Sequence, residues 1–254
     1  CGLLPAQARR IEAMTARHRL IDEYPESKYY KSQIAELGFA YESIADFSTA
    51  AEYYEKLFSL DQEHEAAKDA LFSAGLYRKS LGEWEAAIED FNKYITAWPD
   101  DERVAGMTID VAQIYADNGK TDEAMRVFES FFENPPAGAS IDQAFYARMQ
   151  YGLLLESKGS NPNKHWASTL SEFEAAKSSG QEIPLATEIA AQIMFKQAAP
   201  TLDKYLAMDI SGPNRPMNER KTNEVLKDQL VSKAKSLQAV SYTHLTLPTK
   251  WWVE

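Results

Sequence analysis

The chain has 254 residues, of which 27 are Lys or Arg and 38 are Asp or Glu, so its formal net charge at pH 7 is −11. An acidic chain without a basic cluster is poorly suited to neutralising phosphates, which argues against nucleic-acid binding. Its one cysteine, Cys1, excludes a disulfide framework and a cysteine-based zinc site, and no stretch of 18 residues is apolar enough to predict a membrane-spanning helix.

The first predicted element is a helix between Ala6 and Tyr24, ended by Pro25 because proline lacks an amide hydrogen and clashes with the preceding turn. Cys1 has two interpretations: the lipidated first residue of a mature bacterial lipoprotein, or the start of a truncated reading frame. The lone cysteine at position 1 favours the first, and the absence of a Ser/Gly-rich tether before Pro5 favours the second. A lipid anchor at Cys1 therefore stays open.

Residues 27–136 contain three copies of one pattern with a period of 37 residues. Each copy places a small residue on a first helix, a turn residue seven positions later, and then an aromatic, Ala and aromatic order on a second helix. The members, taken through the three copies in turn, are Gly38, Gly75 and Ala112; Ala45, Gly82 and Gly119; Phe47, Trp84 and Thr121; Ala50, Ala87 and Ala124; Tyr54, Phe91 and Phe128. A fixed period of this length indicates a stack of antiparallel helix pairs.

These residues resemble the tetratricopeptide (TPR) repeat, in which a bulky residue, Leu-Gly, Tyr, Gly, an aromatic, Ala and Phe follow one another in that order. Three positions depart from the pattern: Ala45 replaces a glycine, Arg78 a tyrosine and Gln62 a proline. The period also exceeds the usual 34 residues by three. The resemblance implies an all-α fold, a right-handed superhelical solenoid of antiparallel helix pairs.

The segments between repeats, residues 24–27 and 98–101, loosely resemble those of bacterial envelope-associated TPR proteins, such as outer-membrane assembly lipoproteins and repeat proteins of gliding machinery. That likeness favours the periplasm or outer membrane as the location, and the cytoplasm remains an alternative. In the same scheme, residues 1–26 are the second helix of a truncated repeat.

Downstream the pattern degrades. Residues 137–180 are predicted to form a fourth repeat in which Gly152 and Gly159 keep the seven-residue gap and residues 160–163 are a turn insertion. Residues 181–239 are predicted to form a long helical pair, with helices from about Leu185 to Met208 and from Asn218 to Ala239, on either side of a Gly/Pro/Asn loop.

The last segment, residues 240–254, has no helical period, and residues 240–249 contain no charged side chain. Residues 240–249 resemble the in-frame translation of a sequencing adapter. A scar of this kind is excluded from fold reasoning, so we expect residues 240–254 to be a non-native tail.

No motif predicts catalysis. The four histidines, His18, His64, His165 and His244, do not stand at metal-ligand spacing from one another. There is no phosphate-binding glycine loop, nucleophile elbow or zinc-protease motif. The sequence therefore predicts no catalytic residue, metal or cofactor, and a protein that is not an enzyme.

The resemblance implies that the first helix of each repeat lines a concave groove. Carried over to this chain, the groove residues are Phe39, Phe72, Leu76, Lys79, Gln113, Tyr146 and Met149. Lys79 is the only cation among them, so the carboxylate clamp of some family members is not expected, and an apolar groove suits a partner helix or an extended hydrophobic segment. The competing interpretation is that neighbouring helices cover these side chains.

Two functions follow from this pattern. The first is a protein–protein interaction scaffold that binds a peptide or partner helix in the groove without catalysis. The alternative is a non-catalytic arm of a larger enzyme, or of an envelope or motility machine, whose other domains lie outside this chain.

Overall fold

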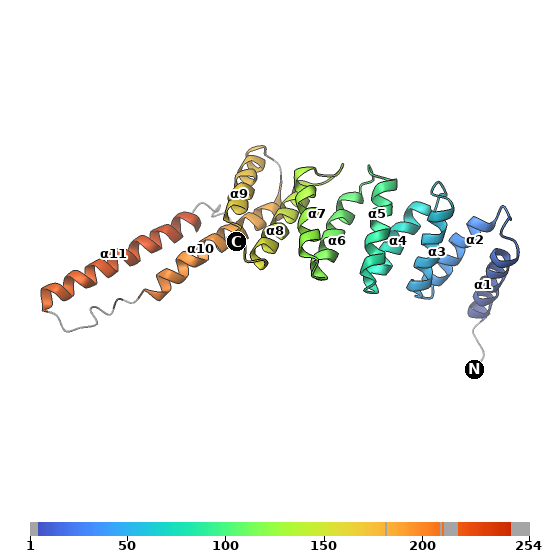
Figure 1. The fold of residues 1–254 in the computed structure, drawn as a ribbon, viewed down its shortest axis with the longest axis horizontal. Coiled ribbons are helices and arrows are strands. Elements are labelled where there is room, and N and C mark those ends of the chain that lie inside the picture. Colours follow the sequence, from blue (N-terminus) through green and yellow to red (C-terminus); the bar gives the residue numbers. More distant parts are fainter. Residues whose placement is uncertain (1–4, 181, 209, 211–217, 245–254) are drawn as a thin grey trace. The chain divides into compact units, whose positions relative to one another are not determined.

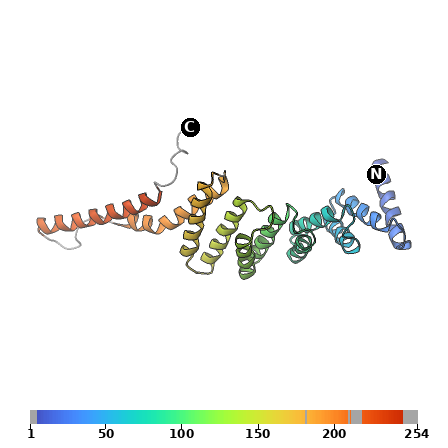
Figure 2. The ribbon, with the colours of Figure 1, turned by 90° about the horizontal axis from the view of Figure 1, so that it is seen from above.

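The computed structural model describes residues 5–180, 182–208, 210 and 218–244, and Cys1 and residues 245–254 lie outside this range. All regular secondary structure in the described residues is α-helical (Figures 1 and 2). This confirms the all-α fold. The chain divides into two compact units, residues 1–143 and residues 144–254.

The first unit holds three successive helix pairs preceded by a single helix. In chain order its helices are α1 (Pro5–Glu23), α2 (Tyr30–Glu42), α3 (Phe47–Leu60), α4 (Ala67–Ser80), α5 (Trp84–Ala97), α6 (Val104–Asp117) and α7 (Thr121–Glu133). Each helix packs against the next one along the chain. The single helix α1 ends before Pro25, as the sequence predicts.

The second unit begins within α8 (Ile141–Ser157) and continues with α9 (Asn163–Ser178), α10 (Pro184–Ala207) and α11 (Glu219–His244). The bounds of the last helix differ from the sequence prediction. The sequence places the end of the last helix at Ala239, whereas α11 continues through five residues of the expected tail to His244.

The turns inside the three repeats share one backbone conformation. Ala45, Gly82 and Gly119 have φ angles of 61°, 78° and 73°, in the left-handed region. Glycine adopts this region without a steric penalty, and a residue with a Cβ does not. The predicted turn positions are therefore confirmed, and Ala45 carries strain that Gly82 and Gly119 avoid.

The small residue on each first helix lets the second helix approach closely. A Cβ built on Gly75 would lie 2.6 Å from Cε1 of Phe91, and Cβ atoms on Gly38 and Gly152 would overlap the rings of Tyr54 and Trp166. The aromatic side chains that occupy this space, such as Phe91 and Trp166, are almost fully buried. Both compact units thus use the same contact of a glycine with an aromatic ring to join their helix pairs.

Candidate interaction surface

The predicted groove residues of the first unit lie on α2, α4 and α6, the first helices of the three pairs. Phe39 on α2 is 48% exposed, and its ring meets that of Tyr54 edge-on at a centroid distance of 5.6 Å. Apolar surface that is exposed to water gains free energy when a partner covers it. Phe39 is therefore the predicted groove residue with the most apolar surface open to a partner.

The apolar side chains of α4 are less open. Phe72 and Leu76 are half-buried against a core cluster that includes Tyr94 and Val111. The Arg103 guanidinium covers Phe72, with its central carbon 4.9 Å from the ring centroid. The competing interpretation, that neighbouring residues cover the groove side chains, thus describes Phe72 in part.

Two ion pairs between α4 and the α6 segment lie on either side of Phe72 and Leu76 in the sequence of α4. Asp69 accepts a hydrogen bond from Arg103 at 2.8 Å, and Lys79 donates one to Asp110 at 2.7 Å. These pairs are partly exposed, and exposed pairs contribute little to stability. Lys79, the only cation predicted for the groove, is already engaged by an acidic residue of the next repeat.

The remaining predicted residues differ in accessibility. Gln113 on α6 is half-buried and donates to Asp117 on its own helix at 2.7 Å. Tyr146 and Met149 lie on α8 in the second unit, where Tyr146 is half-buried and Met149 is buried. The candidate surface of the first unit is accordingly formed by Phe39, Phe72, Leu76, Lys79 and Gln113.

Two tyrosines, Tyr54 and Tyr77, interact with one glutamate at the junction of the first two repeats, and the Tyr54 ring also contacts Phe39. Glu42, at the end of α2, accepts a hydrogen bond from the Tyr54 hydroxyl and also interacts with Tyr77 of α4. Burial, together with the Glu42 carboxylate, raises the pKa of Tyr77 to about 12. Both hydroxyls therefore stay protonated at neutral pH and hold Glu42 in place.

Sequence reasoning did not identify Arg103 as part of this surface. It precedes α6 by one residue, outside the helix positions that the resemblance supplies. A signal was present, because a cation is disfavoured at the positive end of a helix dipole unless other charges hold it. Asp101 and Asp69 supply those charges through hydrogen bonds of 3.1 and 2.8 Å.

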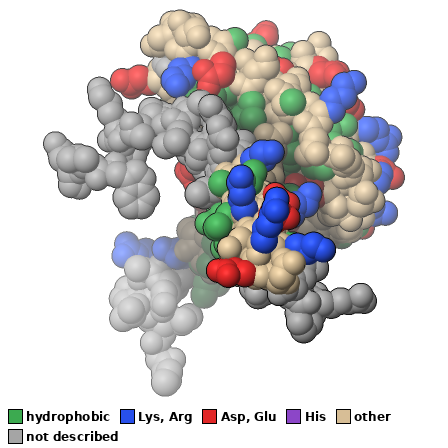
Figure 3. All heavy atoms as spheres, turned by 90° about the vertical axis from the view of Figure 1, so that its left-hand side faces the viewer, with side chains coloured by type: hydrophobic (Ala, Val, Ile, Leu, Met, Phe, Trp, Pro, Cys, Tyr) green, Lys and Arg blue, Asp and Glu red, His purple; other side chains and the backbone are tan. Residues whose placement is uncertain are grey.

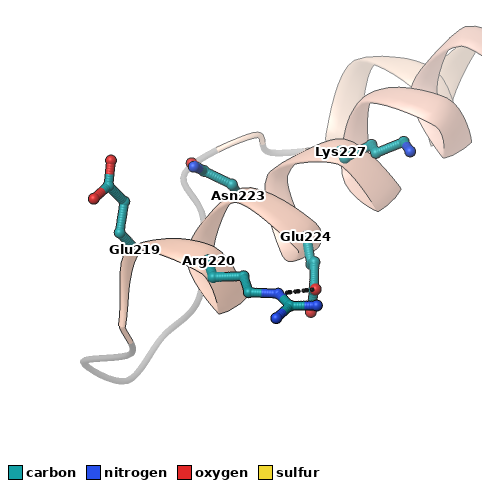
Figure 4. A pocket seen from close by; sticks show the side chains of 5 residues that line it. All are labelled: Glu219, Arg220, Asn223, Glu224 and Lys227. Carbon is teal, nitrogen blue, oxygen red and sulfur yellow. Dashed lines mark ion pairs between the residues drawn. The ribbon is translucent and has the colours of Figure 1, made fainter.

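The described part of the second unit has a shallow concavity on α11. Glu219, Arg220, Asn223, Glu224 and Lys227 line it, and all five are exposed side chains of α11 (Figure 4). Arg220 and Glu224 form an ion pair of 3.4 Å on this face. Viewed from the side where α10 and α11 lie, Lys and Arg side chains stand beside hydrophobic ones (Figure 3).

No group of three or more His, Cys, Asp or Glu side chains in the part of the chain that the structure describes could hold a metal ion. None of the helices in the described ranges combines the length and hydropathy needed to span a bilayer.

Several solved structures are similar to this chain. BtubC from P. vanneervenii is 13% identical, with 92% of this chain and 90% of that chain covered and a TM-score of 0.43. A tetratricopeptide repeat protein from Parabacteroides merdae is 14% identical (94% and 85% covered, TM-score 0.42). YrrB, described as a TPR protein with an unusual peptide-binding site, is 17% identical (88% and 97% covered, TM-score 0.41).

The sequence comparisons are more local. No curated protein matches the chain. Family models described as tetratricopeptide repeat match residues 35–64 and residues 69–101. These two segments coincide with the first two predicted repeats, and so confirm that TPR repeats are present.

Proposed function

With tetratricopeptide repeats at residues 35–64 and 69–101, we propose that this chain is a protein–protein interaction scaffold that binds a peptide or a partner helix and does not itself catalyse a reaction. The binding surface in this proposal is the face of α2, α4 and α6 that carries Phe39, Phe72 and Leu76. The observation that carries the proposal is the exposure of Phe39, an aromatic side chain at a groove position with about half of its surface open.

The surroundings of Phe39 and Phe72 favour an apolar anchor from the partner, flanked by polar contacts. Aromatic and aliphatic side chains supply the contact area, while the Asp69–Arg103 and Lys79–Asp110 pairs supply charge at the margins. Interfaces of this kind gain most of their binding energy from a few central anchors and little from charges at the rim. An apolar face of a partner helix, or an extended apolar segment, meets these requirements.

A matched pair of substitutions tests the proposed surface. Phe39→Ala removes the exposed groove ring, whereas Ile44→Ala removes an apolar side chain of the same 48% exposure in the turn between α2 and α3. We expect Phe39→Ala to weaken capture of a partner from an extract of the source cells about 30-fold, the equivalent of roughly 2 kcal/mol for an aromatic anchor. Ile44→Ala should bind as the unchanged protein does.

Circular dichroism of both variants controls for folding, and both spectra should stay helical. Equal binding by the Phe39→Ala variant and the unchanged protein would contradict the groove. Equal weakening by both substitutions would instead indicate that the edge formed by the turns contributes to binding.

A further inference from the structure

The junctions between successive helix pairs are built from residues in the same register of the 37-residue period. Each junction combines a residue of the preceding helix, a residue of the first helix of the pair and a residue of its second helix. The three sets are His18, Tyr41 and Tyr53; Glu55, Arg78 and Asp90; Asn92, Tyr115 and Val127. The second set alone consists entirely of ionisable side chains of opposite charge.

The first junction is a hydrogen-bonded cluster of one imidazole and two phenol groups, without an acidic side chain or an arginine. Nε2 of His18 and the Tyr41 hydroxyl are 2.9 Å apart, and Nδ1 of the same ring is 3.3 Å from the Tyr53 hydroxyl. The Tyr41 and Tyr53 rings stack at a centroid distance of 5.6 Å. Each imidazole nitrogen of His18 therefore has a tyrosine hydroxyl as its hydrogen-bond partner.

The second junction is organised by Arg78. Its Nε donates to Oε1 of Glu55 at 2.6 Å and its Nη2 to Oε2 at 3.1 Å, so the guanidinium holds both oxygens of that carboxylate. Its Nη1 donates to Glu83 at 2.5 Å. The Arg78 side chain is only 11% exposed, so its hydrogen bonds to Glu55 are shielded from water.

Asp90 completes this junction with only a long ion pair to offset its charge. It is 2% exposed, and its Oδ2 is buried without a hydrogen-bond donor among the described residues. Nζ of Lys93 on the same helix lies 3.8 Å from Oδ1 of Asp90 and also pairs with Glu89 at 2.8 Å. A buried, unpaired carboxylate oxygen costs more than almost any other polar defect.

We propose that Asp90 and Glu55 form a buried proton-binding site, in which one proton bridges the two carboxyl groups and couples the first repeat to the second. The proton supplies the donor that the buried oxygen of Asp90 lacks. Arg78 keeps the charge on Glu55, so the proton resides on Asp90 and is donated to Glu55. Loss of the proton leaves two carboxylates, Glu55 on α3 and Asp90 on α5, that raise each other's energy, while Arg78 and Lys93 act against this repulsion.

The charges around the site agree with this assignment. Burial and the neighbouring Glu55 carboxylate raise the pKa of Asp90 to about 7, although Lys93 and Arg78 act in the opposite direction. The charged groups that face or flank the pair are Glu55 on α3, Arg78 on α4, Glu83 before α5, and Glu89 and Lys93 on α5.

The sign of the resulting pH dependence follows from linkage. Because the folded pKa lies above the unfolded value of 3.8, the folded protein binds more protons between these two values. The contribution of Asp90 to stability is therefore fully present below pH 4 and is lost as the pH rises toward 7. The junction therefore contributes more to the free energy of unfolding at mildly acidic pH than at alkaline pH.

Asp90→Asn tests the site, because the amide replaces the protonated carboxyl group and cannot ionise. We expect the unfolding equilibrium constant of the unchanged protein, measured in urea, to rise by up to about tenfold per pH unit between pH 5 and 7 beyond any rise seen in the Asp90→Asn variant. At pH 8.5 the variant should need more urea to unfold than the unchanged protein. Glu85→Gln, at an exposed carboxylate of the same helix, is the control and should keep the original pH profile.

A carbon-13 NMR titration of the aspartate carboxyl groups in the unchanged protein gives an independent reading. One resonance that is absent from the Asp90→Asn spectrum should titrate between about pH 6 and 8. Parallel pH profiles for the variant and the unchanged protein, or an Asp90 resonance that is fully ionised at pH 5, would overturn the proposal. If the Asp90→Asn variant does not fold, backbone-linked assignment of the aspartate carboxyl resonances in the unchanged protein identifies Asp90, and its titration decides the proposal.

Discussion

The first two repeats place the same backbone around two different junctions. Tyr41 and Arg78 occupy equivalent positions, 37 residues apart, and each contacts the preceding helix. Around Tyr41 the contacts are hydrogen bonds between phenol and imidazole groups, whereas around Arg78 they are ion pairs with acidic groups. The repeat therefore fixes which positions meet and leaves the chemistry of the contact free to vary.

This difference has an energetic consequence. A neutral cluster that loses one hydroxyl loses a single hydrogen bond, which contributes about 1 kcal/mol. A charged cluster that loses its central cation leaves buried carboxylates without compensation, which costs about 3–5 kcal/mol. The second junction should therefore be more sensitive to substitution than the first, although both lie in the same register.

The largest effect is expected from Arg78→Met, which keeps an apolar stem and removes the guanidinium. Glu55 and Asp90 would then face each other without a shielded cation, and the free energy of unfolding at pH 8 should fall by about 3–5 kcal/mol. Urea unfolding followed by circular dichroism measures this loss. Arg126→Met on α7, where the arginine is exposed and pairs with Glu123 of its own helix, is the control and should change stability little.

A triple substitution that introduces the residues of the first junction into the second tests the same comparison. Replacing Glu55, Arg78 and Asp90 together by His, Tyr and Tyr places the side chains of the first junction in the second. The triple variant should recover most of the stability that Arg78→Met loses. A loss of less than about 1 kcal/mol for Arg78→Met would show that water already compensates the two carboxylates.

An intermediate effect is expected at the turns. There the first repeat has the strained residue, Ala45, and the second repeat has a glycine, Gly82, at the equivalent position. Gly82→Ala should cost about 1–2 kcal/mol, because alanine is strained at a φ of 78° and no atom stands within 4 Å to add a clash. Ala45→Gly should raise stability by up to about 1 kcal/mol, since it relieves the same strain at a φ of 61°. Thermal unfolding of both variants checks the pair, and shifts of the same sign would contradict this explanation.

The smallest effect is expected from Tyr41→Phe. The substitution keeps the stacked ring on Tyr53 and removes the hydroxyl 2.9 Å from His18, so unfolding should become easier by about 1 kcal/mol. Urea unfolding at pH 7 compares it directly with Arg78→Met. Equal losses for the two substitutions would remove the distinction between the neutral and the charged junction.

Much of the fold of the first unit was predictable from the sequence because it depends on local rules that repeat. The 37-residue period placed the turns at Ala45, Gly82 and Gly119, and all three have positive φ. The sequence also placed a small residue, such as Gly75, on each first helix, and the structure shows that this residue lies against the aromatic ring of Phe91. The end of α11 was missed, because residues 240–244 show no helical period and yet continue the helix.

The candidate surface was less predictable. The resemblance supplied Phe39, Phe72 and Leu76, but their exposure depends on what packs over them. Phe72 is covered by Arg103, a residue that precedes the next first helix and lies outside the predicted groove positions. Asp90 could have been noticed, since it stands in register with Tyr53 and Val127 on the buried side of a second helix.

The sequence by itself determined the helix pairs, the turn positions and the equivalence of the three junctions, because period, glycine and aromatic spacing act on the local backbone. Only the tertiary structure decided which charges meet at the second junction. Glu55, Arg78 and Asp90 lie on three different helices, and the Arg78–Glu55 hydrogen bonds and the burial of Asp90 arise when those helices pack. The protonation of a carboxyl group depends on that burial and on those neighbours, and so it is a property of the packed junction.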